Sequence, residues 1–370
     1  MKPRRALTIA LLAVLGAGPL AVPAAPAPAM QYYTLADFAR VAKIDAHVHI
    51  HGPANAFMAQ ALHDNFRILT INVDYPDYPP IAEQQYAAVS LQQRYPGRVA
   101  FAATFSVAGF GTPQWAEHAI SRLDAAQRQG AVGVKIWKNI GMALRDPDGR
   151  YVMPDDPRLE PVYAWLERTH LVLLGHQAEP LNCWLPPAKM TVRSDREYFS
   201  EHPQYYMYQH PEMPSHDAIL EARDRMLTRH PGLAFDGVHL ASLEWDVDEV
   251  ARFLDRFPTA RVDMAARLVH LEYQSVAHRE KVRRFLLRYQ DRILYGSDDN
   301  YGPADGDAAA VREVHDGWRA DWRFLVTQDA LHSPDFAGTF HGLHLPRAVV
   351  DKIYRGNAMA LFPGAWADTH

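Results

Sequence analysis

Eight short runs of apolar and β-branched residues recur along the chain, and this repetition most narrows the folds that it can adopt. Several runs are apolar almost throughout, which is typical of parallel strands that helices cover on both faces. Segments that carry helix start and stop signals separate these runs. The expected strands are 41–49, 67–73, 98–105, 131–137, 171–176, 233–239, 260–264 and 292–298.

Helical signals fill the gaps between these strands. The expected helices include 113–129, 215–230, 246–257 and 277–289. Eight strands, each followed by room for a helix, predict the α/β class and a (β/α)₈ TIM barrel. A doubly wound open sheet is the alternative, but no Gly-x-Gly-x-x-Gly turn follows any expected strand.

One connection is too long for a plain loop. The segment 177–214, between the fifth strand and the next helix, is rich in Pro, Tyr and Trp. Long loops in compact domains are often lids or binding loops. A packed excursion or a contact in a homodimer would explain the segment equally well, so the sequence predicts a long aromatic-rich loop without assigning its role.

The first 29 residues have the composition of a signal peptide. Lys2, Arg4 and Arg5 precede an apolar stretch, and Ala27-Pro28-Ala29 offers a small-residue cleavage site. The apolar stretch is interrupted by Gly and Pro and is short for a membrane span. We therefore expect a periplasmic or secreted protein with no stable membrane insertion, a mature domain over 30–370, and export by the general or the twin-arginine route.

Charge and cysteine content exclude several classes of partner and site. The chain carries a formal net charge of −5, which becomes −8 when the three cations of the leader are removed. An acidic chain disfavours nucleic acid as a partner. Cys183 is the single cysteine, so an internal disulfide and a thiolate-rich zinc site are both excluded. A metal would have to be held by histidine and carboxylate.

Residues of that kind stand at the ends of several expected strands. His47 and His49 are two apart, so they share one face of a strand. The other strand ends supply Lys135, His176, His239 and Asp298. The C-terminal ends of barrel strands meet in one bowl, where imidazole and carboxylate suit Zn²⁺, with Mn²⁺ or Fe²⁺ as alternatives. A metal-activated water would then be the nucleophile, Asp298 its proton acceptor, and His239 its orienting or charge-stabilising partner.

These motifs resemble the amidohydrolase superfamily, in the amidohydrolase-related branch that also contains aminocarboxymuconate-semialdehyde decarboxylase. The resemblance implies one divalent metal held by His47, His49, His176 and Asp298. His239 would be a catalytic histidine or a ligand of a second metal, and Lys135 stands where binuclear members carry a carboxylated lysine. Ala241 replaces a glycine that usually follows the sixth strand. The matching pieces are Asp45-Ala46-His47-Val48-His49, Gly133-Val134-Lys135, Gly175-His176, His239-Leu240-Ala241-Ser242, Tyr295-Gly296-Ser297-Asp298 and Tyr354-Arg355-Gly356-Asn357-Ala358.

The function that follows is a metal-dependent hydrolase of a small-molecule amide, ester or lactone. A metal-dependent non-oxidative decarboxylase is the main alternative, and it would need an arginine such as Arg267 on the substrate carboxylate. A non-catalytic barrel that binds a partner would carry no metal. Phosphoesterases that begin with His-x-His are disfavoured by the Gly-Ser-Asp and Gly-Asn-Ala motifs. Further candidates for substrate contact are Trp137, Lys138, Glu179, Trp184, Glu244, Trp245, Asp299 and Asn300.

Overall fold

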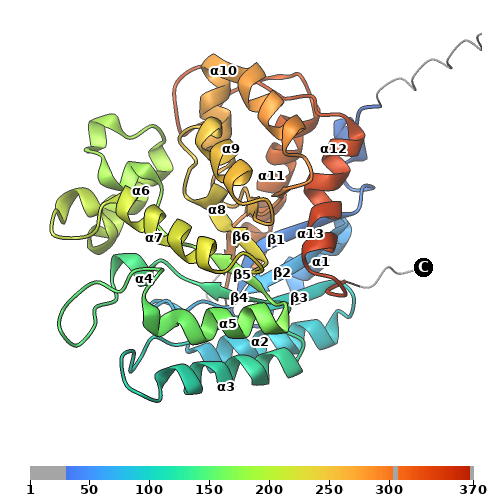
Figure 1. The fold of residues 1–370 in the computed structure, drawn as a ribbon. Coiled ribbons are helices and arrows are strands. Elements are labelled where there is room, and N and C mark those ends of the chain that lie inside the picture. Colours follow the sequence, from blue (N-terminus) through green and yellow to red (C-terminus); the bar gives the residue numbers. More distant parts are fainter. Residues whose placement is uncertain (1–30, 303–306, 367–370) are drawn as a thin grey trace, which may run out of the picture. The chain divides into compact units, whose positions relative to one another are not determined.

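A parallel sheet forms the centre of the molecule, and helices surround it (Figure 1). The computed structural model describes residues 31–302 and 307–366, which belong to a unit spanning Gln31–His370. The signal peptide expected over 1–29 lies outside the described residues and stays a prediction. Of the described helices, none is both long and apolar enough to cross a membrane.

The sheet follows the order β8-β7-β6-β5-β4-β3-β2-β1-β9, and every pairing in it is parallel. The eight expected strands are all present, most of them shorter than expected, and the eighth continues after a break as β9. The strands are β1 (Lys43–Ile50), β2 (Phe66–Ile71), β3 (Val99–Thr104), β4 (Gly133–Ile136), β5 (Val172–Gly175), β6 (Phe235–Gly237), β7 (Arg261–Asp263), β8 (Ile293–Leu294) and β9 (Asp299–Tyr301).

The two ends of the sheet meet at β1. The backbone N–H of Ala46 donates to Tyr295 O at 3.0 Å, and that of Asp298 donates to His47 O at 2.8 Å. Beyond these bonds, β9 pairs with β1 from Val48 onward. The sheet therefore returns on itself, as the predicted TIM barrel requires.

Gly296 makes this approach possible. A Cβ atom at Gly296 would lie 2.8 Å from the Cβ of His47, closer than side chains tolerate. Asp45 then ties the same two segments together: Oδ1 accepts the N–H of Ser297 at 3.0 Å, and Oδ2 accepts Trp318 Nε1–H at 2.9 Å. The first residue of the Asp-x-His-x-His motif thus has a structural contact, while its histidines face the interior.

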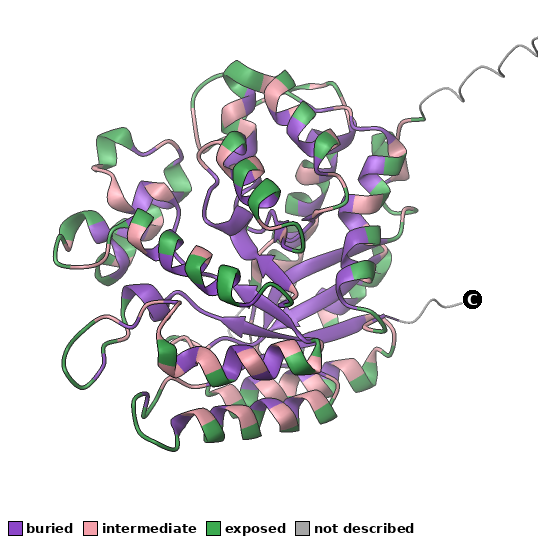
Figure 2. Cartoon of the chain, in the orientation of Figure 1, coloured by how far each residue is buried: buried purple, intermediate pink, exposed green. Residues whose placement is uncertain are grey.

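Helices cover the outside of the sheet. Figure 2 shows strands buried along their length and helices buried on one side and exposed on the other. The longer helices are α1 (Asn55–His63), α2 (Ile81–Arg94), α3 (Trp115–Arg128), α5 (Glu160–Thr169), α6 (Arg193–Glu201), α7 (His216–Arg229), α9 (Val247–Arg256), α10 (Leu268–Arg288) and α11 (Asp307–Val326). The shorter ones are α4 (Asn139–Met142), α8 (Val238–Ala241), α12 (Arg347–Asp351) and α13 (Asn357–Leu361).

The expected helix boundaries hold best where a cap defines them. Ser215 caps α7 by accepting the N–H of Ala218 at 3.2 Å, and Asp246 caps α9 by accepting that of Asp248 at 2.9 Å. The helix expected over 277–289 is instead the second half of α10, which begins at Leu268 and is interrupted at His278 (φ −134°, ψ 39°).

The segment after β5 is built from short helical elements. It contains α6 and four 3₁₀ turns, over Leu181–Trp184, Pro187–Lys189, Pro203–Tyr205 and Met207–Gln209. Figure 1 shows this segment beside α7, apart from the helices that surround the sheet. The backbone groups of the expected long loop are thus largely paired within the segment itself.

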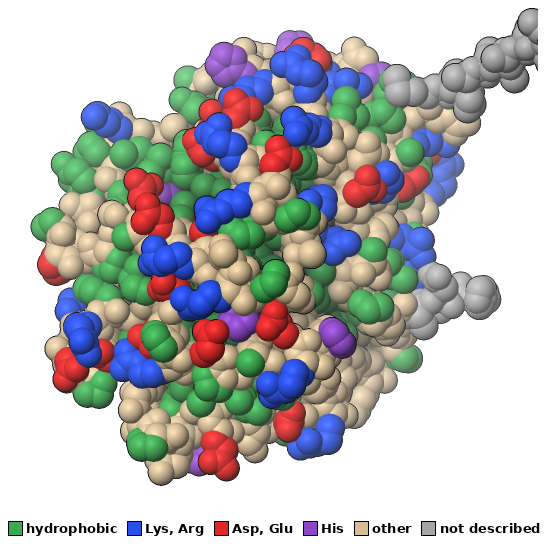
Figure 3. All heavy atoms as spheres, in the orientation of Figure 1, with side chains coloured by type: hydrophobic (Ala, Val, Ile, Leu, Met, Phe, Trp, Pro, Cys, Tyr) green, Lys and Arg blue, Asp and Glu red, His purple; other side chains and the backbone are tan. Residues whose placement is uncertain are grey.

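Apolar residues alternate between two core clusters. In β2, Leu69 and Ile71 face the barrel interior, while Phe66 and Ile68 pack against the outer helices. The interior cluster also includes residues of α13 and the segment after it, and Trp366 Nε1–H donates to Ile68 O at 3.2 Å. The outer faces of the helices carry interspersed charges of both signs (Figure 3).

Candidate metal centre

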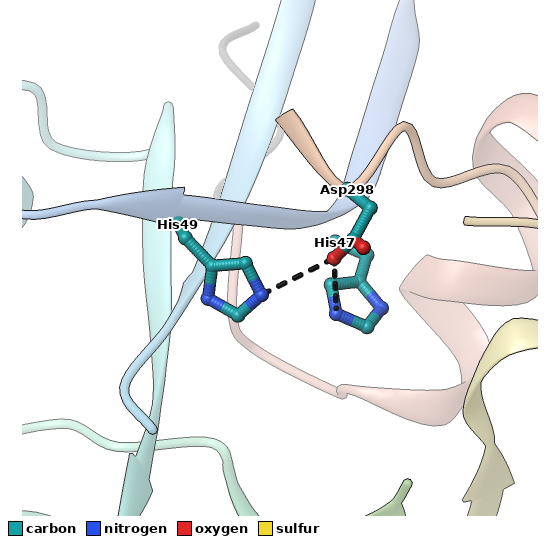
Figure 4. Close-up of side chains that lie close together, drawn as sticks. All are labelled: His47, His49 and Asp298. Carbon is teal, nitrogen blue, oxygen red and sulfur yellow. Dashed lines mark ion pairs between the residues drawn. The ribbon is translucent and has the colours of Figure 1, made fainter. Parts of the chain in front are cut away.

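His47 and His49 point from β1 toward Asp298, as Figure 4 shows. His49 Nδ1–H donates to Ile71 O at 2.8 Å, and His47 Nδ1–H donates to Asp263 Oδ2 at 2.6 Å. Because both Nδ1 atoms are engaged, the Nε2 atoms carry the lone pairs that a metal needs. Each Nε2 lies 3.2 Å from Asp298 Oδ1.

This spacing fits a first-row cation. Two ligand atoms that each lie about 2.1 Å from a tetrahedral metal are roughly 3.4 Å apart. Both imidazole nitrogens therefore stand at coordination spacing from Asp298 Oδ1, and all three ligand atoms lie within 4.8 Å of one another. Burial alone would raise the pKa of Asp298, but the neighbouring His239 and His47 outweigh it and hold that pKa well below the ordinary value. Asp298 is thus a carboxylate, as a ligand or a proton acceptor must be.

Asp298 also departs from ordinary backbone geometry. Its φ is 72°, in the left-handed region that non-glycine residues seldom adopt. The residue lies between β8 and β9, at the point where the sheet returns to β1. Strain of this kind is often found at functional sites, where the surrounding structure enforces it.

Asp263 belongs to the candidate site, although it was not predicted from the sequence. It ends β7 and is completely buried. Its Oδ2 accepts His47 Nδ1–H, and its Oδ1 accepts the backbone N–H of His239 at 2.6 Å. A carboxylate in this position fixes the tautomer and direction of a metal-binding imidazole. The signal was available, because an acid ends an expected strand here just as Asp298 follows another.

His239 stands beside His47 on a left-handed turn. Its φ is 60°, and its Nδ1–H donates to Ala265 O at 2.9 Å. The His239 ring centre lies 4.8 Å from that of His47, and a second group with metal-ligand spacing consists of His47, His239 and Asp263. The position suits both predicted roles of His239, as a catalytic histidine and as a ligand of a second metal.

His176 is close to the centre but not within its ligand group. Its ring centre lies 4.3 Å from that of His239, while the three groups at coordination spacing are His47, His49 and Asp298. His176 Nε2 is buried and has no hydrogen-bond partner within the described ranges 31–302 and 307–366. The structure therefore brings three of the four predicted ligands together and leaves the fourth imidazole nearby with an unused nitrogen.

Lys135 completes the predicted set. Its Nζ lies 3.1 Å from His47 Nε2, on the side where the ligand atoms converge. Burial lowers the pKa of Lys135 to about 8, with Asp298 acting in the opposite sense. Burial also lowers the pKa of His47, and it lowers those of His176 and His239 well below the usual range. These imidazoles are neutral near pH 7, which metal coordination requires.

Comparison with known proteins identifies the family. An amidohydrolase family model matches residues 44–364. The chain belongs to the amidohydrolase family. It is therefore an enzyme of the amidohydrolase superfamily, a family whose members usually bind a metal, and the residues at this centre fit one.

Solved structures share the barrel of this amidohydrolase at low sequence identity. An uncharacterised TIM-barrel protein from Bordetella bronchiseptica is 13% identical (TM-score 0.53; 88% of this chain and 99% of that chain). A 2,6-dihydroxybenzoate decarboxylase from Rhizobium is 14% identical (TM-score 0.51; 87% and 98%). A Pseudomonas putida protein provisionally named 2-pyrone-4,6-dicarboxylic acid hydrolase is 13% identical (TM-score 0.51; 88% and 99%). At these identities the likeness shows the fold alone. A comparison with curated protein sequences finds no match.

A cavity of about 370 Å³ opens over the centre of the amidohydrolase. His49, His176, His239, Lys135 and Asp298 lie in its wall. Of the residues predicted to contact substrate, Trp137, Lys138, Glu179, Arg267 and Asn300 also line it. Tyr75 and Tyr78 also line the cavity, although they were not predicted as site residues. The only signal for them was their position shortly after β2, because residues that follow barrel strands lie around the same bowl.

The remaining substrate candidates have other positions. Trp184 and Trp245 pack on either side of His216, with ring centres 4.9 and 5.0 Å away, and neither lines the cavity. Glu244 accepts the N–H of Leu181 at 2.8 Å and, like Asp299, is not a cavity residue. The aromatic segment after β5 does contribute, because its Tyr198 and Phe199 form part of the wall.

Proposed function

We propose that this amidohydrolase is a metal-dependent hydrolase that acts on a small-molecule amide, ester or lactone. The observation that carries the proposal is the convergence of His47 Nε2 and His49 Nε2 on Asp298 Oδ1, at 3.2 Å each. His49 and Asp298 line the cavity. One divalent cation, Zn²⁺ by the chemistry of the donors, is the expected occupant, with Mn²⁺ or Fe²⁺ as alternatives. When bound, such a cation acts as a Lewis acid and lowers the pKa of water.

The side chains supply the rest of the reaction. Asp298 is ionised, so it can take a proton from attacking water and return it to the leaving group. His239 is neutral and its Nδ1–H is bonded to Ala265 O, so Nε2 is the atom that can accept a hydrogen bond and orient that water. Asp263 holds His47 in the tautomer that presents Nε2. The aromatic cavity excludes bulk water and limits the substrate to a small molecule.

Non-oxidative decarboxylation is the second candidate, and Arg267 favours it. A decarboxylase needs a cation for the substrate carboxylate, and the buried guanidinium of Arg267 lines the same cavity. Here Asp298 would first take up a proton from water and then deliver it to the carbon that loses CO₂, and His239 would orient that water. We further propose export of the mature chain, on the composition of residues 1–29 alone.

Metal analysis combined with a substrate panel tests the proposal. We expect about one equivalent of metal, and hydrolysis of a lactone, amide or ester that chelation stops and metal restores. Asp298→Asn should lower kcat by about 10²-fold or more, because a proton acceptor is lost. Asp299→Asn is the matched control, since this neighbouring acid does not line the cavity. His176→Ala should lower both metal content and activity if His176 moves to complete the ligand set.

Two results would contradict this reading. Release of CO₂ from carboxylated phenols, with no hydrolysis across the panel, would establish the second candidate instead. Full folding with well under one equivalent of metal would remove the cation from the mechanism. Stoichiometric metal retained by His176→Ala would exclude only His176 from the ligands.

A further inference from the structure

Three polar side chains beside the candidate metal centre lie close together without forming hydrogen bonds to one another. Arg267 follows β7, whereas His176 and Glu179 follow β5. Arg267 Nη2 lies 3.6 Å and His176 Nε2 lies 3.7 Å from Glu179 Oε2. Both separations exceed a hydrogen bond, so these contacts leave hydrogen-bonding capacity unused, and all three residues line the cavity.

Arg267 has donors that its neighbours leave unused. Its side chain is 9% exposed, and its Nε–H has no hydrogen-bond partner among the residues that the structure describes. Nη1 donates to Ala266 O at 3.0 Å, which uses one of the five N–H groups. A buried donor without an acceptor is costly, so the guanidinium is prepared for a ligand oxygen. The left-handed backbone of Ala266, with φ 52°, sets the direction in which Arg267 leaves the strand.

The charge of Glu179 is shared between two cations, Lys138 and Arg267. Glu179 forms a buried ion pair with Lys138 and also faces Arg267, so two cations share one carboxylate. Lys138 is otherwise engaged, because its Nζ donates to Tyr198 OH at 2.8 Å. Arg267 is therefore the cation with free hydrogen-bonding capacity.

Three further acids lie near Arg267. Burial acts to lower the pKa of Arg267, but Asp195, Glu244 and Asp298, together with Glu179, raise it. Asp195 Oδ2 lies 3.3 Å from His270 Nε2 and accepts Asn182 Nδ2–H at 2.7 Å. Among the described residues none of these acids accepts the Nε–H of Arg267, so that donor is available to a ligand oxygen.

We propose that Arg267 is an anion-recognition residue that binds a substrate carboxylate on the Glu179 side of the cavity, away from the metal ligands. This inference rests on the proposed function and deepens it by naming the substrate class: a small organic acid whose carboxylate stays outside the reacting bond. Guanidinium and carboxylate are both planar and pair through two parallel hydrogen bonds. Tyr75, Tyr78 and Trp137 in the same wall favour a flat, unsaturated body.

Calorimetry on the full-length, zinc-loaded protein with benzoate and benzamide tests this proposal. The two probes have nearly the same shape and differ in charge. The wild type should bind benzoate about tenfold or more tightly than benzamide, which corresponds to about 1.4 kcal/mol. Arg267→Met should abolish the preference and Arg267→Lys should keep part of it. Arg288→Met is the matched control, because that guanidinium is exposed on α10 and pairs with Asp255.

Two more variants distinguish recognition of the carboxylate by Arg267 from a loss of local structure and from binding of the carboxylate to the metal. Glu179→Gln removes the competing carboxylate, so benzoate should bind several-fold more tightly, whereas loss of a purely structural contact would weaken binding. His49→Ala, with the metal site broken, should keep the preference for benzoate. Equal binding of the two probes by the wild type, or a preference that survives Arg267→Met, would overturn the proposal. Loss of the preference in His49→Ala would place the carboxylate on the metal instead. A failure of hydrolysis alone leaves these binding results unaffected.

Discussion

Ala241 and its neighbours carry an unusual backbone next to the metal centre. His239, Leu240, Ala241 and Ser242 have φ values of 60°, 56°, 56° and 55°. For residues with a Cβ atom this left-handed conformation costs roughly 1–2 kcal/mol each. The turn is held by Ser242 Oγ–H, which donates to Ala178 O at 2.6 Å, and by the Asp263 contact to the His239 N–H. Ala241 stands where the resembling family usually has glycine. The turn still forms with alanine there, but its left-handed backbone is strained.

Ala241→Gly should therefore stabilise the protein. Glycine adopts a positive φ without penalty, although the loss of the buried methyl group offsets part of the gain. We expect a net gain of up to about 1 kcal/mol, or a rise in Tm of roughly 2–4 °C. Thermal unfolding of Ala265→Gly is the control, because Ala265 is buried without a positive φ and its replacement should lower Tm. Equal losses in both variants would show that the turn is unstrained.

At the scale of elements, α6 forms a wall of the cavity without belonging to the barrel. Its Ser194, Tyr198 and Phe199 line the cavity. Asp335 holds the start of this helix: its backbone O accepts the N–H of Arg193 and its Oδ1 accepts that of Ser194, both at 2.8 Å. Asp335 lies between β10 (Ala330–Leu331) and β11 (Phe340–His341), which form a small antiparallel hairpin. A segment distant in sequence thus positions part of the substrate wall.

Asp335→Ala should loosen α6 and impair substrate binding more than chemistry. We expect KM to rise by about three- to tenfold with kcat nearly unchanged, because the metal ligands lie on other elements. The N–H groups of Arg193 and Ser194 should also exchange faster with deuterium. Asp329→Ala is the control, since Asp329 is on the same segment and pairs with the exposed Arg323. A kcat loss without a KM change would contradict the positioning role.

At the scale of the whole molecule, two acids on outer helices, Glu272 and Asp321, lie half-buried. Burial, with a contribution from Asp299, raises the pKa of Asp321 on α11 to about 7, although Tyr295 OH donates to its Oδ2 at 2.7 Å and opposes this shift. Burial, with the charges of Asp321 and Asp335, raises the pKa of Glu272 on α10 to about 8. In the unfolded chain such carboxyl groups ionise near pH 4. Between these values the folded state binds the extra proton, so their contribution to stability falls as pH rises.

Asp321→Asn isolates this effect. The amide keeps an oxygen for Tyr295 OH and cannot ionise. The stability of the variant relative to wild type should therefore increase from pH 4.5 to about 7 and then level off, by at most a few kcal/mol at about 1.4 kcal/mol per pKa unit. Chemical denaturation at several pH values measures the difference. Asp316→Asn, on the exposed side of the same helix, is the matched control. A flat profile for Asp321→Asn would contradict the raised pKa.

Local patterns alone predicted the strands, the barrel and the candidate ligands His47, His49 and Asp298. The period of two along β1 places His47 and His49 on one side of a strand, and an apolar run identifies a strand wherever it lies in the chain. Asp298 followed from its position at the end of the eighth run. Each of these inferences needs only neighbouring residues and the rule that the ends of barrel strands converge.

Tertiary structure decided what depends on distances between separate segments. Only the fold shows that Asp263 bonds His47, that Arg267 meets Glu179, and that His176 stands beside the ligand group instead of within it. It likewise shows that Asp335 holds α6. These contacts join residues far apart in sequence, and a shift of one ångström makes or breaks them. These distances cannot be read from local sequence patterns, because the packing of the whole barrel sets them.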